Sequence, residues 1–79
     1  GYGREVLDAL IRHCFEELGL NRIGAEIYAF NKRSIRLFER AGFKREGTMR
    51  LNVLKNDRFE DEHIYGLLRE EWHSNDNTK

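Results

Sequence analysis

The stretch from Ile23 to Phe43 reads IGAEIYAFNKRSIRLFERAGF and contains the two patterns that decide the fold. Its first part, up to Phe30, places apolar residues at alternate positions, which indicates a β-strand that we expect to be covered on both sides. Its second part spaces apolar residues at helical intervals behind Asn31, a good N-cap, and stops at a glycine, which predicts a helix over Lys32–Ala41. A strand followed directly by a helix indicates a mixed α/β (α+β) architecture.

A longer helix is predicted upstream of this stretch, over Gly3–Leu18. Its apolar residues recur at i, i+3, i+4 and i+7, its opposite face is charged, and Gly19 can adopt the left-handed turn that closes a helix. The apolar stripe consists of Val6, Leu7, Leu10, Ile11, Cys14, Phe15 and Leu18.

Two further strands are predicted downstream. Arg45–Leu54 alternates apolar and polar residues, and His63–Leu68 forms a second run after the polar segment Lys55–Arg58. These segments predict a β-hairpin with a loop of several residues. The predicted order is helix, strand, helix, β-hairpin, within one domain over residues 1–72, followed by a polar tail at residues 73–79 that we expect to fray.

Length and composition restrict the function. A chain of 79 residues has room for one small domain at most. The 14 basic and 14 acidic side chains cancel, so no overall field draws the chain to nucleic acid or to a membrane surface. Cys14 is the one cysteine, which excludes an intramolecular disulfide and a four-cysteine zinc site, and the three histidines lack metal-ligand spacing. We therefore expect a cytoplasmic protein with no metal and no membrane span.

The zero net charge is the sum of two oppositely charged segments. The segment from Lys32 to Arg45 contains six basic residues and one acidic residue, Glu39. The segment from Asp57 to Glu71 contains six acidic residues and two arginines. The basic patch is either a solvated helix face or a contact for phosphate, and the acidic one is either a solubilising loop or a region that attracts a cationic substrate.

Two turns could hold chemistry. Gly1-Tyr2-Gly3 precedes the first helix, where free backbone N–H groups favour phosphate, although Val6 stands where a dinucleotide fingerprint requires glycine. The turn from Asn31 to Ser34 lies at the carboxyl end of a strand, a common ligand site, and helix capping explains the same residues equally well.

Taken together, the opening Gly1-Tyr2-Gly3, the run NKRSIRLFERAGF from Asn31 to Phe43 and the pair Glu46-Gly47 resemble the carboxyl-terminal half of a GNAT-superfamily acetyltransferase. The closing segment YGLLREEW, Tyr65–Trp72, resembles the branch with ribosomal-protein N-terminal, spermidine and amino-sugar acetyltransferases. The resemblance implies transfer of an acetyl group from acetyl-CoA to a primary amine by direct attack.

The resemblance also implies site residues. Gly1, Tyr2, Gly3 and Arg4 match the end of the glycine-rich loop that binds the CoA pyrophosphate. Asn31 matches a residue that touches the pantetheine arm, and Ser34 matches a serine that gives a proton to the leaving thiolate and belongs to the cofactor site. A tyrosine that many members use as general acid is replaced by Phe38, so Ser34 or water takes that role, or the reaction needs no acid.

The amino-terminal strands of the family fold have no counterpart before Gly1. We therefore expect this chain to be the carboxyl-terminal part of a longer acetyltransferase, or to assemble with a second copy that completes the sheet. Two alternatives remain: a binding or assembly module that uses Arg33, Arg36 and Arg40, and a fragment without a function of its own.

Overall fold

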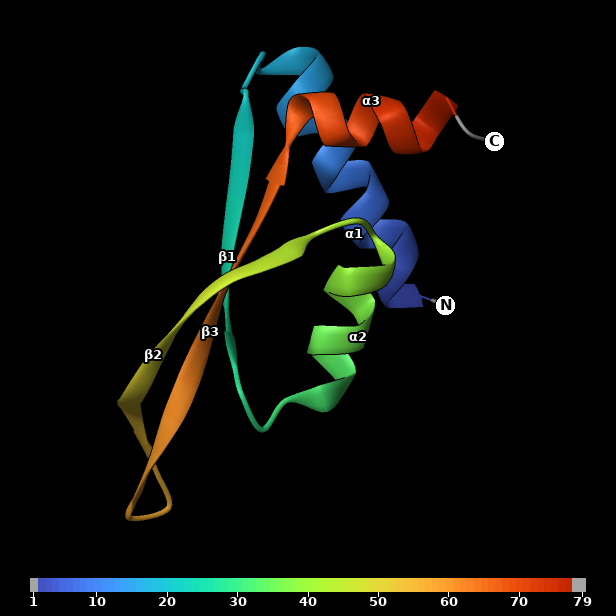
Figure 1. Cartoon of the computed structure of the whole chain (residues 1–79). Helices are drawn as coiled ribbons and strands as arrows, with labels where there is room; N and C mark the ends of the chain where they lie inside the picture. Colours follow the sequence, from blue (N-terminus) through green and yellow to red (C-terminus); the bar gives the residue numbers. More distant parts are fainter. Residues whose placement is uncertain (1, 78–79) are drawn as a thin grey trace.

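In the computed structural model, the chain is described over residues 2–77, with side chains over residues 3–73. Three helices pack on one side of a three-stranded antiparallel sheet (Figure 1). In chain order the elements are α1 (Tyr2–Arg12), the π-helical turn η1 (His13–Glu17), β1 (Arg22–Tyr28), α2 (Lys32–Arg40), β2 (Lys44–Lys55), β3 (Arg58–Leu68) and α3 (Arg69–Asn77).

The sheet has the order β1-β3-β2, so the last strand of the chain lies between the other two. β3 pairs with β1 in a register that sets Ala25 opposite Tyr65, and it pairs with β2 through a hairpin. The predicted loop of several residues is wrong, because a two-residue turn joins the strands. Asn56 and Asp57 both have positive φ, at 52° and 65°, as a type I′ hairpin turn requires.

The predicted first helix is confirmed in position, and its closing glycine is confirmed too, with Gly19 at φ 66°. Its buried stripe is narrower than predicted. Leu7, Ile11 and Phe15 are buried at i, i+4 and i+8, whereas Val6 and Leu10 are 57% and 53% exposed. The helix also widens into a π turn at η1, which no feature of the sequence indicated.

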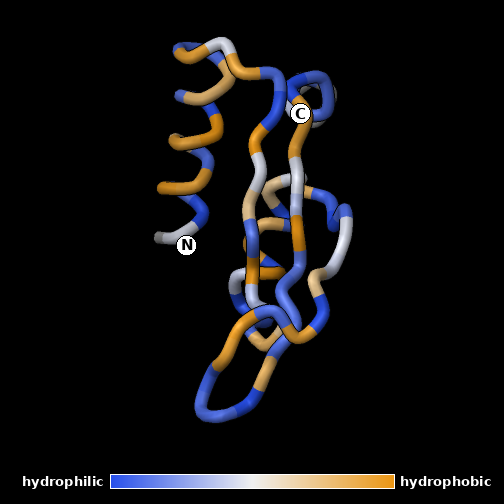
Figure 2. The backbone as a smooth tube through the Cα atoms, turned by 90° about the vertical axis from the view of Figure 1, so that its left-hand side faces the viewer, coloured by the Kyte–Doolittle hydropathy of each residue, from blue (hydrophilic) through white to orange (hydrophobic). Residues whose placement is uncertain are grey.

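The predicted first strand is confirmed, but the expectation that it is covered on both sides is wrong for the described chain. Ile27 is buried beneath the helices, while Gly24, Glu26 and Tyr28 point to the other face and are exposed. Seen from that face, the strands lie in front and no described helix covers them (Figure 2).

The carboxyl-terminal part differs most from the prediction. β3 begins at Arg58, five residues before the predicted strand, since its charged first half is held by pairing with β2. α3 was not predicted, and it takes in residues 73–77 of the segment expected to be a polar tail; residues 78 and 79 lie outside the described residues. Trp72 of α3 packs on Phe15, with 5.3 Å between ring centroids.

One hydrophobic core joins the helices to β1 and β3. It lies between the helices and the sheet, and partly buried side chains such as Trp72 pack against it. Among the described residues, no helix is both long and apolar enough to cross a bilayer. The buried core residues are Leu7, Ile11, Phe15, Ile27, Ile35, Phe43, Tyr65 and Leu67.

Candidate functional site

The candidate site lies where β1 ends and α2 begins. Asn31 is the N-cap of α2, because its Oδ1 accepts a hydrogen bond of 3.2 Å from the backbone N–H of Ser34. The predicted cap is therefore confirmed. Since the Oδ1 atom is used inside the chain, the amide NH₂ of Asn31 is the group left to donate to a ligand.

A pocket of about 370 Å³ opens beside this cap. It brings together three residues that the sequence singled out, namely Asn31, Ser34 and Phe38. It also contains residues that sequence reasoning did not select. The complete lining is Glu26, Ile27, Tyr28, Asn31, Ser34, Phe38 and Glu62.

Glu62 is the acidic group of this pocket that lies deepest in the protein. Its side chain is buried, and its Oε1 accepts a 2.9 Å hydrogen bond from the Asn52 amide. β3 places it opposite Tyr28 of β1 and Met49 of β2. In the sequence it belonged only to a general acidic stretch, because the register that carries it to the end of β1 is a long-range property of the sheet.

Phe38 and Tyr28 form two walls of the pocket with different chemistry. Phe38 is half-buried and meets Phe43 edge-on, with 5.0 Å between ring centroids, so it serves as an apolar wall. Tyr28 is 43% exposed and lines the pocket from β1, where its ring packs on Phe30 with 5.2 Å between ring centroids. A tyrosine therefore lines this pocket from β1, whereas α2 has Phe38 at the position where many family members have a tyrosine.

The start of α1 lies against α2 (Figure 1). A Cβ atom built on Gly3 would stand 3.4 Å from Cδ2 of Leu37, so the first turn of α1 meets the helix that carries Ser34. The first backbone N–H groups of a helix have no partner inside it and favour a negative group. Arg4 points its Nε to Asp8, at 2.9 Å. Gly1 and the side chain of Tyr2 lie outside the described residues.

The predicted basic patch is smaller in the structure. Lys44 pairs with Glu71 at 2.7 Å, and this hydrogen bond raises the pKa of Lys44 and lowers the pKa of Glu71. Arg45 donates from Nε to the Tyr65 hydroxyl at 3.3 Å. The cations that remain exposed on α2 are Lys32, Arg33, Arg36 and Arg40.

Comparison with known proteins places this chain in a family. The family model described as an acetyltransferase (GNAT) domain matches residues 1–44. The prophage-derived uncharacterized N-acetyltransferase YokL of Bacillus subtilis is 33% identical over 75 residues, which cover 95% of this chain and 42% of that protein. The putative ribosomal N-acetyltransferase YdaF of the same organism is 40% identical over 63 residues, covering 80% of this chain and 34% of that protein.

Solved structures show the same fold. The spermidine/spermine N-acetyltransferase SpeG of Vibrio cholerae superposes with a TM-score of 0.89 at 23% identity, covering 95% of this chain and 44% of that chain. The chain therefore spans less than half the length of the relatives it matches. Because the family model covers more than half of the 79 residues, and because the fold agrees, the chain belongs to the GNAT acetyltransferase family.

Proposed function

We propose that this chain carries the acetyl-CoA site of an N-acetyltransferase whose acceptor is a primary amine, of a protein N-terminus, a polyamine or an amino sugar. The observation that carries the proposal is the pocket at the end of β1, where Asn31 and Ser34 come together on the helix that meets the start of α1. Family membership supports acetyl transfer to an amine in general.

The residues present suit the cofactor. The start of α1 offers backbone N–H groups at Gly3 and Arg4, which are suited to the CoA pyrophosphate, and Gly1 and Tyr2 precede them in the sequence. Asn31 offers amide protons suited to the pantetheine carbonyl groups. Acetyl-CoA supplies the thioester, whose acetyl carbon is attacked by the amine nitrogen while the carbon–sulfur bond breaks.

We assign the two proton transfers of this reaction to Ser34 and Glu62, which line the same pocket. Ser34 is half-buried in the pocket and would give a proton to the departing thiolate. Glu62, whose Oε1 is held by Asn52, would accept the proton that the amine nitrogen loses. The amine loses one proton to Glu62 and the thiolate gains one from Ser34, so the number of protons is balanced over the transfer.

The sheet surface suggests that catalysis needs more protein than these residues. β1 pairs with β3 alone in the described chain, and Val6 and Leu10 are exposed on α1. We infer that the site is completed in a longer chain or by a second copy that covers this edge. Binding of CoA to the chain alone is accordingly expected to be weak.

The test is acetyl transfer from acetyl-CoA to spermidine, glucosamine and an N-terminal peptide, measured with a longer chain that completes the site and, beside it, with this chain, together with calorimetric binding of CoA. Ser34→Ala should lower kcat by a larger factor than it weakens CoA binding. Thr48→Ala is the matched control, because it removes a hydroxyl on β2 that contacts His63 outside the pocket. Equal kcat values in the parent and Ser34→Ala would exclude Ser34 as the proton donor.

A binding module that uses the exposed cations of α2 is the second candidate. All four cations of α2 are exposed. If this function holds, a nucleic acid binds with an affinity that falls steeply with salt, and Arg33→Gln, Arg36→Gln and Arg40→Gln each reduce that affinity. Binding of CoA without any binding of nucleic acid would reject it.

A further inference from the structure

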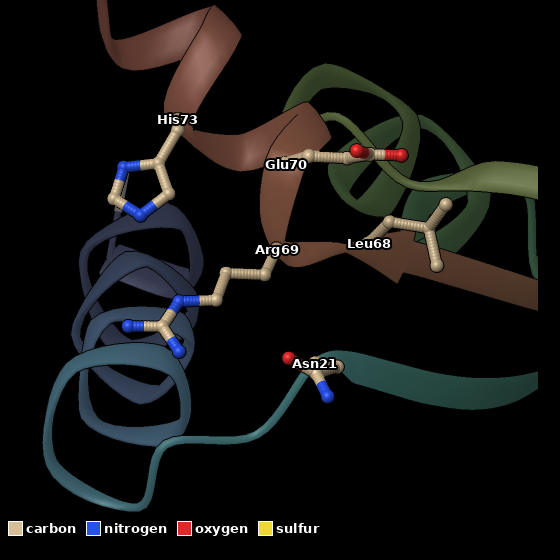
Figure 3. A pocket seen from close by; sticks show the side chains of 5 residues that line it. All are labelled: Asn21, Leu68, Arg69, Glu70 and His73. Carbon is tan, nitrogen blue, oxygen red and sulfur yellow. The ribbon is translucent and has the colours of Figure 1, made fainter.

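A second pocket lies far from the proposed acetyl-CoA site, where the residue before β1, the end of β3 and the first turns of α3 meet (Figure 3). Its volume is about 390 Å³. The proposed function leaves it unused. Its lining consists of Asn21, Leu68, Arg69, Glu70 and His73.

The backbone fixes the positions of the polar groups in this pocket. The N–H of Arg69 donates to the carbonyl oxygen of Asn21 at 2.9 Å, so the start of β1 is tied to the start of α3. Arg69 and His73 stand at i and i+4 and share one face of α3. Trp72, next to His73, packs on Phe15 at 5.3 Å and holds α3 against the core.

Three of the lining side chains carry hydrogen-bond donors, namely those of Asn21, Arg69 and His73. In Figure 3 the guanidinium group of Arg69 lies between the His73 ring and Asn21, while the Glu70 carboxylate extends to the opposite side. Within residues 3–73, no hydrogen bond or ion pair is made by the side chains of Arg69, His73 or Asn21. At the start of α3, the Glu71 carboxylate accepts a hydrogen bond of 3.0 Å from the backbone N–H of Leu68, so this N–H group already has a partner within the chain.

The geometry points to a binding site for a small ligand with an oxyanion group, phosphate or carboxylate. A half-buried guanidinium offers a planar fork of N–H donors that matches two oxygens of such a group. The Asn21 amide and the His73 ring add donors from two sides, and Leu68 gives an apolar wall for the rest of the ligand. This site is separate from acetyl transfer and does not depend on it.

The test is a titration of the ¹⁵N-labelled chain with sodium phosphate and with sodium acetate, at an ionic strength held constant with sodium chloride. Saturable shifts of the Asn21 amide and the Arg69 Nε–H are expected with at least one of the two anions. The anion that saturates identifies the source as a phosphate or a carboxylate ligand. Arg69→Gln should weaken this binding about tenfold or more, the loss of one charged bidentate contact.

Two controls keep the test decisive. Arg50→Gln removes a cation from an exposed position on β2 and should leave the dissociation constant unchanged. His73→Ala changes an exposed residue, so it tests the site should Arg69→Gln fail to fold, and it should weaken binding several-fold. Shifts that stay linear with both anions, or that saturate at Ser34 instead of Asn21, would overturn the proposal.

Discussion

Tyr65 is a single residue that joins three elements. It lies on β3, has no exposed surface, and donates from its hydroxyl to Oε2 of Glu39 on α2 at 2.8 Å. It also accepts from Nε of Arg45 on β2, whose guanidinium carbon lies 5.8 Å from the centre of the Tyr65 ring. The helix that carries the candidate site is thus fixed to the sheet by a phenol in the core.

Removing this hydroxyl should destabilise the fold while its ring keeps filling the core. We expect Tyr65→Phe to lower the free energy of unfolding by about 1.5–3 kcal/mol, the usual net contribution of a hydrogen bond to a charged group. Urea denaturation measures this difference. Tyr28→Phe is the control, because Tyr28 is 43% exposed, and its loss should stay within about 0.5 kcal/mol. Equal losses in both variants would show that the Tyr65 hydroxyl contributes nothing specific.

Gly66 makes room for an ion pair on the open face of the sheet. Arg22 of β1 reaches across this central-strand glycine to Glu46 of β2, with Nη1 2.7 Å from Oε2. A Cβ atom at Gly66 would overlap both side chains. The hydrogen bond from Arg22 lowers the pKa of Glu46 below its ordinary value of 4.5.

The pKa of Glu46 should therefore depend on Gly66. Because the folded-state pKa is lowered, the pair adds stability above the unfolded value near 4.5, and this stability is lost as the pH falls through the folded-state pKa. Gly66→Ala should raise the pKa of Glu46 toward 4.5, as should Arg22→Gln, which removes the partner without adding a side chain. Carbon-detected titration of the Glu46 carboxyl measures both, and an unchanged value in Arg22→Gln would contradict the pairing.

At the scale of the elements, the sequence predicts a helix or strand correctly where the residues of one short segment determine its structure. Asn31 and the spacing behind it predicted α2 to within one residue, since a cap and an apolar stripe act within a few turns. The start of β3 could not be predicted, because Arg58–Glu62 is held as a strand by its partner β2. α3 was missed for a similar reason: it is polar, and Trp72 is fixed to Phe15 from the far end of the sequence.

The cap of α2 also allows its structural role and its ligand role to be separated. Asn31→Asp keeps the oxygen that accepts from the Ser34 N–H, and a carboxylate suits a helix start, so stability should be retained. The same change removes the amide protons, so CoA should bind about tenfold more weakly. Asn31→Ala loses both groups and should also cost about 1 kcal/mol of stability. Full CoA affinity in Asn31→Asp, measured by calorimetry, would remove Asn31 from the cofactor site.

Across the whole molecule, the candidate site was only half visible in the sequence. Asn31 and Ser34 are neighbours in the chain and were found by their position after a strand. Glu62 reaches the same pocket through strand pairing, and Gly3 reaches α2 through helix packing. Contacts of this kind depend on the folded arrangement of distant segments, which spacing along the chain does not specify.

The uncovered surface of the molecule leads to the last prediction. Val6 and Leu10 form an apolar strip on α1, and β1 has a free edge among the described residues, so burying both in a second copy would remove apolar surface and unpaired backbone groups from water. We expect the average mass in sedimentation equilibrium to rise above 9.4 kDa with concentration.

Leu10→Lys should shift the chain to monomer without unfolding it, because that side chain is 53% exposed. Leu54→Lys, on the hairpin and 63% exposed, is the matched control and should leave association unchanged. A constant monomer mass for the parent chain at all concentrations would exclude a second copy as the partner of this surface.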